Sequence, residues 1–426
     1  MTGRRRLTTR PLRTTAVSAV CVAVSAALLA GCDGLPGARG DSGDPITVMT
    51  WAPEGTRATN MPGMPAMAAA FARWVNARGG IHGRDLKVIT CNERNESVTA
   101  SRCARRAVEE GVVAVVGSYS QHGRAMMSPL EASGTPFIGG YGLTDEELSS
   151  PLSYPVNGGQ AALLAGNGRQ LAGVCKRVAL VRPDTISGDQ LPGLLDAGLA
   201  AAGRPPATDL RAPEDATDYE RTSTEALKAA GTDGGGCVTA ALGERTDTFF
   251  DSFRRQPEAG AKVRIASVLG SVKQSLVDST GGAKSPLEGA FATGWYPAAD
   301  DRRWTSMREV IDRHAFGDNR VDPADPGVQT TWVAYTALRS VLMALDADDI
   351  SAHSVRTALD RGHRVGTGGL TPPLSWRYQD LLAVPDYPRI VNANVTYQVV
   401  RDGRLVAVRE GFTDVTRTLE HRRKHP

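Results

Sequence analysis

The residues of this chain that could perform chemistry are scattered, and their spacing gives little support for catalysis. Ser120 and His122 lie close together in the segment GSYSQHG. A nucleophile elbow would need glycines two residues before and after the serine, where this chain has Ser118 and His122. The seven histidines form no His-Glu-x-x-His pair, so zinc hydrolysis has no ligands at a suitable spacing. We therefore expect a protein that is not an enzyme and uses no cofactor or metal.

Neighbouring carboxylates do not change this expectation. They occur as adjacent residues at positions 146–147, 300–301 and 348–349, in polar surroundings. Adjacent side chains point to different sides of a helix or strand, so such a pair cannot act together as general acid and base. A solvated surface accounts for them better.

The elements that would position a binding site are clearest between residues 76 and 140. Three short runs rich in β-branched residues, LKVIT, VVAVVG and TPFIGG, alternate there with helical segments. Alternating strands and helices predict a parallel sheet. Ligands of such sheets bind beyond the carboxyl ends of the strands, which makes the loops at 118–123 and 139–144 the first candidates.

This region resembles the type I periplasmic binding proteins, through the segments ARGGIHGRDLKV, GVVAVVGSYS and SGTPFIGG. A weaker resemblance extends from about residue 46 to residue 412. The chain is most similar to the branched-chain amino-acid receptors of ABC importers. It implies an α/β fold with two lobes. Each lobe would be a parallel sheet flanked by helices, and a hinge of three segments would join them.

Two helical segments, one before this region and one after it, carry apolar residues at helical spacing, which is typical of core packing. The stripe of the first contains Met67, Phe71, Trp74 and Val75. The stripe of the second contains Trp332, Tyr335, Leu338, Val341, Leu342 and Leu345. We expect these side chains to stabilise a lobe rather than to contact a ligand.

The amino terminus indicates export. Five arginines precede an apolar run at residues 16–30 that is too short to span a bilayer comfortably. The run ends in Leu29-Ala30-Gly31-Cys32, which resembles the lipobox of bacterial lipoproteins and implies lipidation of Cys32. Residues 1–31 would then be a signal peptide and residues 32–45 a lipidated tether, and the protein would be anchored to the outer face of the cell membrane.

Four cysteines remain in the exported chain once Cys32 is lipidated, in a compartment where disulfides form. Of the three possible pairings we favour Cys91 with Cys103 and Cys175 with Cys237. The first pair lies on a strand and on the helix that follows it, and the members of the second pair each begin a strand of one parallel sheet. Free buried thiols and a metal site are the alternatives.

Charge and length limit the partners and the architecture. The formal charge is +3, and residues 1–31 hold five arginines and no acids, so the mature chain comes to 3 − 5 = −2. This value argues against a nucleic-acid partner. The mature chain is also longer than one hydrophobic core usually serves, so two lobes are expected.

The family's arrangement gives the lobe boundaries. Lobe I would comprise residues 46–156 and 290–369, lobe II residues 157–289 and 370–412, and a tail residues 413–426. The chain would cross between the lobes near Pro155, Gly294 and Gly369.

Several loops are candidates for ligand binding. The loop at 118–121 follows a strand and opens a helix, so its N–H groups favour an anionic or carboxylate group. Gln121 stands where the receptors place a ligand-binding serine, and neither Thr185-Ile186-Ser187 nor the loop at 269–272 matches the aromatic and acidic positions of the family. The candidate residues are Ser118, Tyr119, Ser120, Gln121, Gly140, Tyr141, Thr144, Trp51, Glu54, Thr185, Ser187, Ser271, Trp295 and Tyr296.

These observations predict an extracytoplasmic solute-binding lipoprotein. It would capture a small polar ligand, such as an amino acid or a related metabolite, in a cleft between the lobes and deliver it as a monomer to an ABC permease. A ligand-sensing module of the same fold, acting through a membrane or surface partner, is the alternative. The sequence does not separate these two functions.

Overall fold

The computed structural model describes residues 43–422, apart from residues 186, 214–215, 258–262 and 269–270. The predicted signal peptide, Cys32 and almost all of the tether lie outside the described residues. Residues 42–426 form one compact unit, which contains two sheets. None of the helices in the described part of the chain is long and apolar enough to span a membrane.

The first sheet, which defines lobe I, has five parallel strands in the order β2-β1-β3-β4-β5. Alternate residues of β1 pack into different clusters, with Val48 on one face of the sheet and Met49 and Trp51 on the other. A strand buried on both faces is typical of a parallel sheet covered by helices. The strands are β1 (Ile46–Ala52), β2 (Leu86–Asn92), β3 (Val115–Val116), β4 (Phe137–Ile138) and β5 (Ser153–Tyr154).

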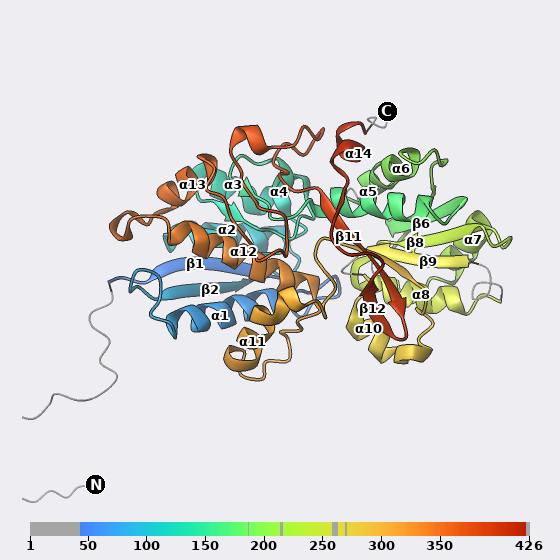
Figure 1. The fold of residues 1–426 in the computed structure, drawn as a ribbon, viewed down its shortest axis with the longest axis horizontal. Helices are drawn as coiled ribbons and strands as arrows, with labels where there is room; N and C mark the ends of the chain where they lie inside the picture. The colour runs from blue at the N-terminus through green and yellow to red at the C-terminus, as the bar shows by residue number, and fades with distance from the viewer. Residues whose placement is uncertain (1–42, 186, 214–215, 258–262, 269–270, 423–426) are drawn as a thin grey trace, which may run out of the picture. The chain divides into compact units, whose positions relative to one another are not determined.

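Helices cover both faces of this sheet (Figure 1). Helices α1 and α12 pack together over one face, and α2 and α3 pack together over the other. Phe71 of α1 contacts Trp332 and Tyr335 of α12 edge-on or tilted, with ring centroids 5.3 Å apart in both pairs, as expected for the two predicted apolar stripes. The helices of lobe I are α1 (Gly63–Asn76), α2 (Ser97–Glu109), α3 (Gly123–Ser133), α4 (Asp145–Ser149), α11 (Thr305–His314), α12 (Pro326–Leu342) and α13 (Ala352–Asp360).

The second sheet, which defines lobe II, has eight strands. Five of them are parallel, in the order β7-β6-β8-β9-β10, and the chain's last strands add antiparallel pairs next to β10. The predicted parallel sheet is thus confirmed for β7-β6-β8-β9-β10, and antiparallel strands extend it beyond β10. The strands are β6 (Arg177–Pro183), β7 (Thr208–Ala212), β8 (Gly236–Ala240), β9 (Val263–Val268), β10 (Phe291–Gly294), β11 (Asn394–Arg401), β12 (Arg404–Ala407) and β13 (Thr413–Asp414).

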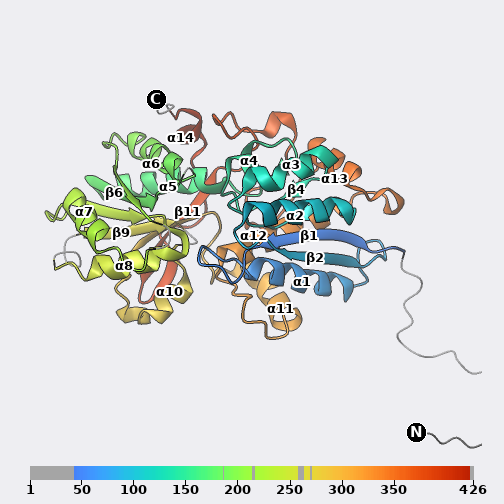
Figure 2. The same ribbon diagram turned by 180° about the vertical axis from the view of Figure 1, so that it is seen from behind.

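Helices also flank this sheet on both faces (Figure 2). Helices α5 and α6 approach closely because glycines face each other: a Cβ atom on Gly168 would lie 2.1 Å from the carbonyl oxygen of Leu195. The helices of lobe II are α5 (Gly159–Ala172), α6 (Leu191–Ala200), α7 (Glu220–Ala230), α8 (Thr246–Arg254), α10 (Gln274–Ser279) and α14 (Thr416–Glu420). Short 3₁₀ helices occur at η1 (Gly188–Gln190), η2 (Gly243–Arg245), η3 (Gly282–Lys284), η4 (Arg302–Trp304), η5 (Ala347–Asp349) and η6 (Tyr378–Asp380).

The lobe boundaries differ from those predicted. Strand β10 pairs with β9 and β11, so residues 291–294 belong to lobe II rather than to a lobe I segment that begins at 290. Residues 370–390 return along lobe I, where Trp376 donates its indole N–H to the carbonyl of Pro155 (2.9 Å) and Arg389 donates to the carbonyls of Leu148 (3.0 Å) and Ser153 (2.9 Å). The third crossing therefore falls just before β11 and not at Gly369.

The predicted tail is partly structured. β13 pairs with β11, and α14 packs against α5 and α6, so residues 413–420 belong to lobe II. Apolar residues explain this: Val415 and Leu419 are fully buried in the hydrophobic core. Residues 423–426 lie outside the described part of the chain.

Both predicted disulfides are present. Cys91 of β2 is bonded to Cys103 of α2, and Cys175 is bonded to Cys237 of β8, with Cα atoms 5.9 Å apart in each pair. The first bond ties a strand to the helix that covers it. The second joins the segment that leads into β6 to the neighbouring strand of the same sheet.

Candidate functional site

A cleft of about 480 Å³, lined by polar and apolar residues in similar measure, lies between the two lobes. Lobe I contributes the loops that follow β3 and β4, and lobe II contributes the first turn of α5 and the segment that follows β6. This is the carboxyl edge of the parallel strands, where ligands of such sheets bind. Its polar lining includes Ser97, Gln121, His122, Arg124, Thr144, Asp145, Glu146, Gln160, Thr185, Ser187, Gln190 and Tyr387.

Helices begin at this cleft from several directions. Residues 123–125 are the first turn of α3, which contains no acidic residue and has no side-chain cap. The first residues of α5 and α6 line the cleft as well, but the N–H groups of Gly159 and Gln160 donate to Asn157 Oδ1 (2.9 Å) and to the carbonyl of Gly142 (2.8 Å), and α6 continues directly from η1. At α3, the backbone N–H groups and the positive end of the helix dipole favour a bound anionic group.

Glu147 shapes the loop that follows β4. Its carboxylate accepts hydrogen bonds from the backbone N–H groups of Gly142 (2.9 Å), Leu143 (3.1 Å) and Thr144 (3.1 Å). Burial raises the pKa of Glu147 to about 7, although these hydrogen bonds lower it. A Cβ atom on Gly140 would lie 2.2 Å from this carboxylate, so Gly140 leaves room for Glu147 rather than for a ligand.

Ser120 has a supporting role below the cleft. Its side chain is fully buried, donates to the Glu93 carboxylate (3.3 Å) and accepts from the backbone N–H of His122 (3.0 Å). Burial raises the pKa of Glu93, and the neighbouring His122 lowers it. The ring atom Nε2 of His122 is buried and has no hydrogen-bond partner among the described residues, at the point where His122 lines the cleft.

On the lobe II side, a buried arginine holds the segment that lines the cleft. Arg182, at the end of β6, is 1% exposed. It donates to both carboxylate oxygens of Asp209 (2.9 Å each), a residue of the neighbouring strand β7, and pairs with Asp189 of η1 (2.8 Å). This two-sided pairing fixes η1 against the sheet.

The residue after Asp189 bridges the cleft. Gln190 donates from Nε2 to Asp145 Oδ2 of lobe I (2.6 Å) and accepts a hydrogen bond from the hydroxyl of Tyr387. On the same segment, Thr185 accepts from the N–H of Gly188 (3.1 Å) and its hydroxyl lies 3.2 Å from that of Ser187. The rim of the cleft is thus closed by one glutamine that contacts elements from both lobes.

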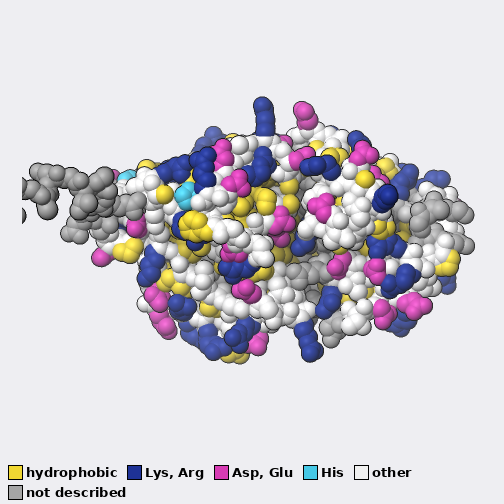
Figure 3. Space-filling model, turned by 90° about the horizontal axis from the view of Figure 1, so that it is seen from below, with side chains coloured by type: hydrophobic (Ala, Val, Ile, Leu, Met, Phe, Trp, Pro, Cys, Tyr) yellow, Lys and Arg dark blue, Asp and Glu magenta, His cyan; other side chains and the backbone are white. Residues whose placement is uncertain are grey.

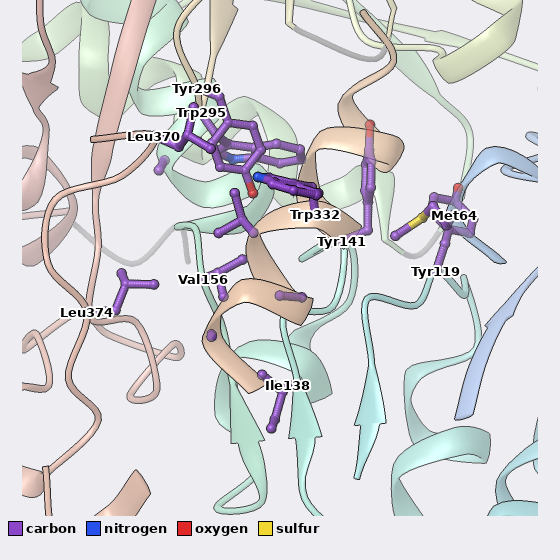
Figure 4. Packing of buried hydrophobic residues seen from close by; sticks show 14 of the residues in the cluster. Met64, Tyr119, Ile138, Tyr141, Val156, Trp295, Tyr296, Trp332, Leu370 and Leu374 are labelled. Carbon is purple, nitrogen blue, oxygen red and sulfur yellow. The ribbon is translucent and has the colours of Figure 1, made fainter. Parts of the chain in front are cut away.

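The predicted aromatic residues form a buried series beside the cleft (Figure 4). Tyr119, Tyr141, Trp295 and Tyr296 follow one another edge to face, with successive ring centroids 5.2, 5.0 and 6.1 Å apart. Trp295 donates to the carbonyl of Gly159 (2.9 Å). These four rings, which were candidates for ligand contact, are therefore packed against one another.

The other candidate residues outside the cleft have structural positions. Trp51 is fully buried in the core between the first sheet and α2 and α3, with Phe137 at 6.0 Å, because its place on β1 points it away from the cleft. Ser118 is buried and accepts from the Trp51 N–H (3.1 Å). Glu54 is exposed and lies 3.5 Å from Arg320.

Ser271 lines a second hollow between the lobes, of about 370 Å³. Lobe I contributes residues 56–58 to it, and lobe II contributes Arg245 and Lys273. Arg245 donates to the carbonyl of Arg57 (3.2 Å), and Lys273 lies 3.9 Å from Asp325 at the start of α12. Contacts therefore join the lobes on this side as well.

Of the fourteen candidate ligand residues, the cleft contains Gln121, Thr144, Thr185 and Ser187. His122 lies in the loop at 118–123, which was a first candidate. The polar lining residues that were not predicted are Ser97, Arg124, Asp145, Glu146, Gln160, Gln190 and Tyr387. The position of Arg124 at the start of a helix after a strand was the available signal for that residue. Nothing near Tyr387 in the sequence indicated a place beside the other cleft residues.

Acidic and basic side chains are intermixed over the face shown in Figure 3. Within the described ranges, no group of three or more histidine, cysteine, aspartate or glutamate residues could hold a metal ion.

Two lobes joined by three chain crossings, with a cleft between them, define a two-lobed solute-binding protein. The family model for periplasmic binding proteins matches residues 49–381, and the chain belongs to that family. A search of curated proteins gave no significant match.

Three solved structures of similar fold have a named ligand or a named class of ligand. A branched-chain amino-acid ABC transporter protein from Thermus thermophilus, with bound valine, is 14% identical with a TM-score of 0.68, covering 87% of this chain and 97% of its own. A fatty acid ABC transporter substrate-binding protein from Thermomonospora curvata is 15% identical with a TM-score of 0.70, covering 89% and 95%. A solute-binding protein from Rhodopseudomonas palustris, in complex with 3,4-dihydroxybenzoic acid, is 16% identical with a TM-score of 0.66, covering 87% and 97%. At these identities the likeness concerns the fold.

Proposed function

We propose that this chain is an exported, lipid-anchored binding protein that captures a small polar carboxylate in the cleft between its lobes and delivers it to an ABC importer. The observation that carries the proposal is the cleft itself, which both lobes line with polar side chains. A volume of about 480 Å³ is in the range of small-molecule sites.

The carboxylate is inferred from the electrostatics of the cleft. Helix α3 begins there without an acidic first turn or a side-chain cap, and His122 Nε2 has no hydrogen-bond partner among the described residues. Each of these features favours a negatively charged oxygen. The ligands named for the three similar structures, valine, fatty acid and 3,4-dihydroxybenzoic acid, all carry a carboxylic acid group.

Export and anchoring rest on the N-terminal sequence and on family membership. If Cys32 receives the lipid, a Cys32→Ala variant should accumulate as unprocessed precursor and lose labelling by a radioactive fatty acid. Labelling that persists in the variant would refute the anchor.

A thermal-shift screen of carboxylate metabolites tests the binding function. A true ligand at about one hundred times its Kd should add about 2.7 kcal/mol to stability and raise the Tm by several degrees. In cells, deletion of the gene should then lower uptake of that ligand. Normal uptake would overturn the transport role and favour the sensing alternative.

A further inference from the structure

A third hollow, on lobe II, lies apart from the cleft. It has a volume of about 930 Å³ and is formed by α6, α14 and the end of α5, with residues 204 and 206 at one edge. It shares no lining residue with the interlobe cleft. We call it the α6–α14 groove.

Basic side chains dominate the polar wall of the groove. Four arginines and His421 line it, against the two carboxylates of Asp196 and Asp414. Both carboxylates hold backbone groups, since Asp196 accepts from the N–H of Ala207 (2.7 Å) and Asp414 from that of Thr416 (2.8 Å). Asp386, 2.8 Å from Arg422, adds a third carboxylate, so four arginines and His421 stand against three carboxylates and positive charge is in excess.

The arginines keep donors available to a ligand. Arg169 and Arg204 each donate to a backbone carbonyl, at 2.8 and 2.9 Å, which leaves their charge unpaired. The exposed side chain of Arg417 makes no hydrogen bond or ion pair with any described residue.

Arg422 gives independent evidence that a hydrogen-bond acceptor is missing. Its side chain is only 10% exposed, and its Nη2 atom lies 2.8 Å from Asp386. Its Nε atom is buried and has no hydrogen-bond partner among the described residues. The guanidinium carbon of Arg422 lies 5.5 Å from the centroid of the Tyr387 ring, and the residue lines the groove, so an anionic group there would add a charged partner to this side chain.

The opposite wall of the groove is apolar. It consists of the small residues of α6 that face away from the buried leucines of that helix, together with Pro206. These small residues are Gly193, Ala197, Ala200 and Ala201. A ligand that fits both walls has a negatively charged head and an apolar body.

We propose that the α6–α14 groove binds an amphipathic carboxylate of medium chain length, with its head group at Arg417 and Arg422 and its hydrocarbon body along α6. The site is separate from the interlobe cleft. Charge complementarity and the unpaired donor of Arg422 support binding at this site, which does not depend on the function proposed for the cleft.

Isothermal titration calorimetry of the mature protein with decanoate, decanol and acetate tests the proposal. Decanoate should bind at least about tenfold more tightly than either decanol, which lacks the charge, or acetate, which lacks the chain. Equal affinity for decanol would mean unspecific adherence to apolar surface, and equal affinity for acetate would mean an anion site without an apolar wall. Either result overturns the proposal.

Variants locate the site. Arg417→Gln and Arg422→Gln should each weaken decanoate binding about tenfold or more, whereas Arg401→Gln, at an exposed end of β11, should leave it unchanged. Because Arg422 also holds Asp386, Arg417→Gln is the decisive variant if Arg422→Gln fails to fold. Gln160→Trp, which fills the interlobe cleft, should leave decanoate binding intact. Loss of decanoate binding in Gln160→Trp would place decanoate in the cleft and contradict the groove.

Discussion

At the scale of single residues, the side chains nearest the cleft fall into two groups. Gln121 and Thr185 line it, whereas Ser120 and Glu147 hold the backbone that forms it. Substitutions in the first group should change ligand affinity directly. Substitutions in the second should change stability first and affinity as a consequence.

Gln121→Ala tests the first group. Loss of one hydrogen bond to the ligand should weaken binding by about 1 to 3 kcal/mol, or roughly 5- to 150-fold, with an unchanged Tm. Gln256→Ala on lobe II is the matched control, and calorimetric titration is the measurement. If Gln121→Ala leaves the affinity unchanged, Gln121 does not contact the ligand.

Glu147 gives the cleft loop a predicted pH dependence. Burial raises its pKa to about 7 in the folded protein from an ordinary value of 4.5, so folding favours the protonated form. Its contribution to stability is therefore fully present below pH 4.5 and is lost as the pH rises towards 7 and above. The loss should be on the order of 3 kcal/mol, measured as the free energy of unfolding in urea between pH 4.5 and 8.

Two variants isolate this effect. Glu147→Gln cannot ionise and should flatten the pH profile in that interval. Glu146→Gln changes a neighbouring, partly exposed residue that lies 4.0 Å from Arg124 and should keep the wild-type profile. A Glu147→Gln profile that still falls between pH 4.5 and 8 by the wild-type amount would assign the dependence to another group.

At the scale of elements, the cleft depends on how η1 is attached to the second sheet. Arg182→Met would leave Asp189 and Asp209 without their buried partner. Because both aspartates are partly exposed, the expected loss in the free energy of unfolding is about 1 to 3 kcal/mol, with weaker ligand binding because Gln190 loses its support.

Arg211→Met is the control for this prediction. Arg211 lies near the same acids, at 3.5 Å from Asp184 and 3.8 Å from Asp189, but it is 59% exposed. Urea unfolding should show a change below about 1 kcal/mol. Equal losses in the two variants would mean that burial of Arg182 adds nothing to the attachment of η1.

At the scale of the whole molecule, the fold could be predicted further than the site. The strands and the apolar stripes around Phe71 and Trp332 follow from local periodicity, and the disulfide pairs follow from their places on neighbouring elements. The role of Tyr387 could not be predicted, because its contact with Gln190 depends on the path by which residues 370–390 return along lobe I. Trp295 was misplaced for a similar reason, since an aromatic residue after a strand can turn towards a ligand or towards another ring.

The contacts that join the lobes predict that a ligand enters only when they open. Gln190 with Asp145 on one side and Lys273 with Asp325 on the other hold the lobes together. Asp145→Cys with Gln190→Cys, joined by a short bis-maleimide, should therefore slow ligand exchange at least about tenfold in stopped-flow measurements. The same double variant without cross-linker is the control, and unchanged exchange in the cross-linked protein would mean that the ligand enters without lobe movement.

Calorimetric titration of the screened carboxylate into a cleft-filled variant tests capture between the lobes most directly. Gln160→Trp places a large side chain in the cleft, and the side chain of Gln160 itself makes no hydrogen bond within the described part of the chain. The control, Thr224→Trp, places the same side chain on the exposed surface of α7. The wild type and Thr224→Trp should bind one ligand per chain with equal affinity, and Gln160→Trp should bind none. Binding of wild-type affinity by a folded Gln160→Trp protein would contradict the assignment of the ligand to this cleft.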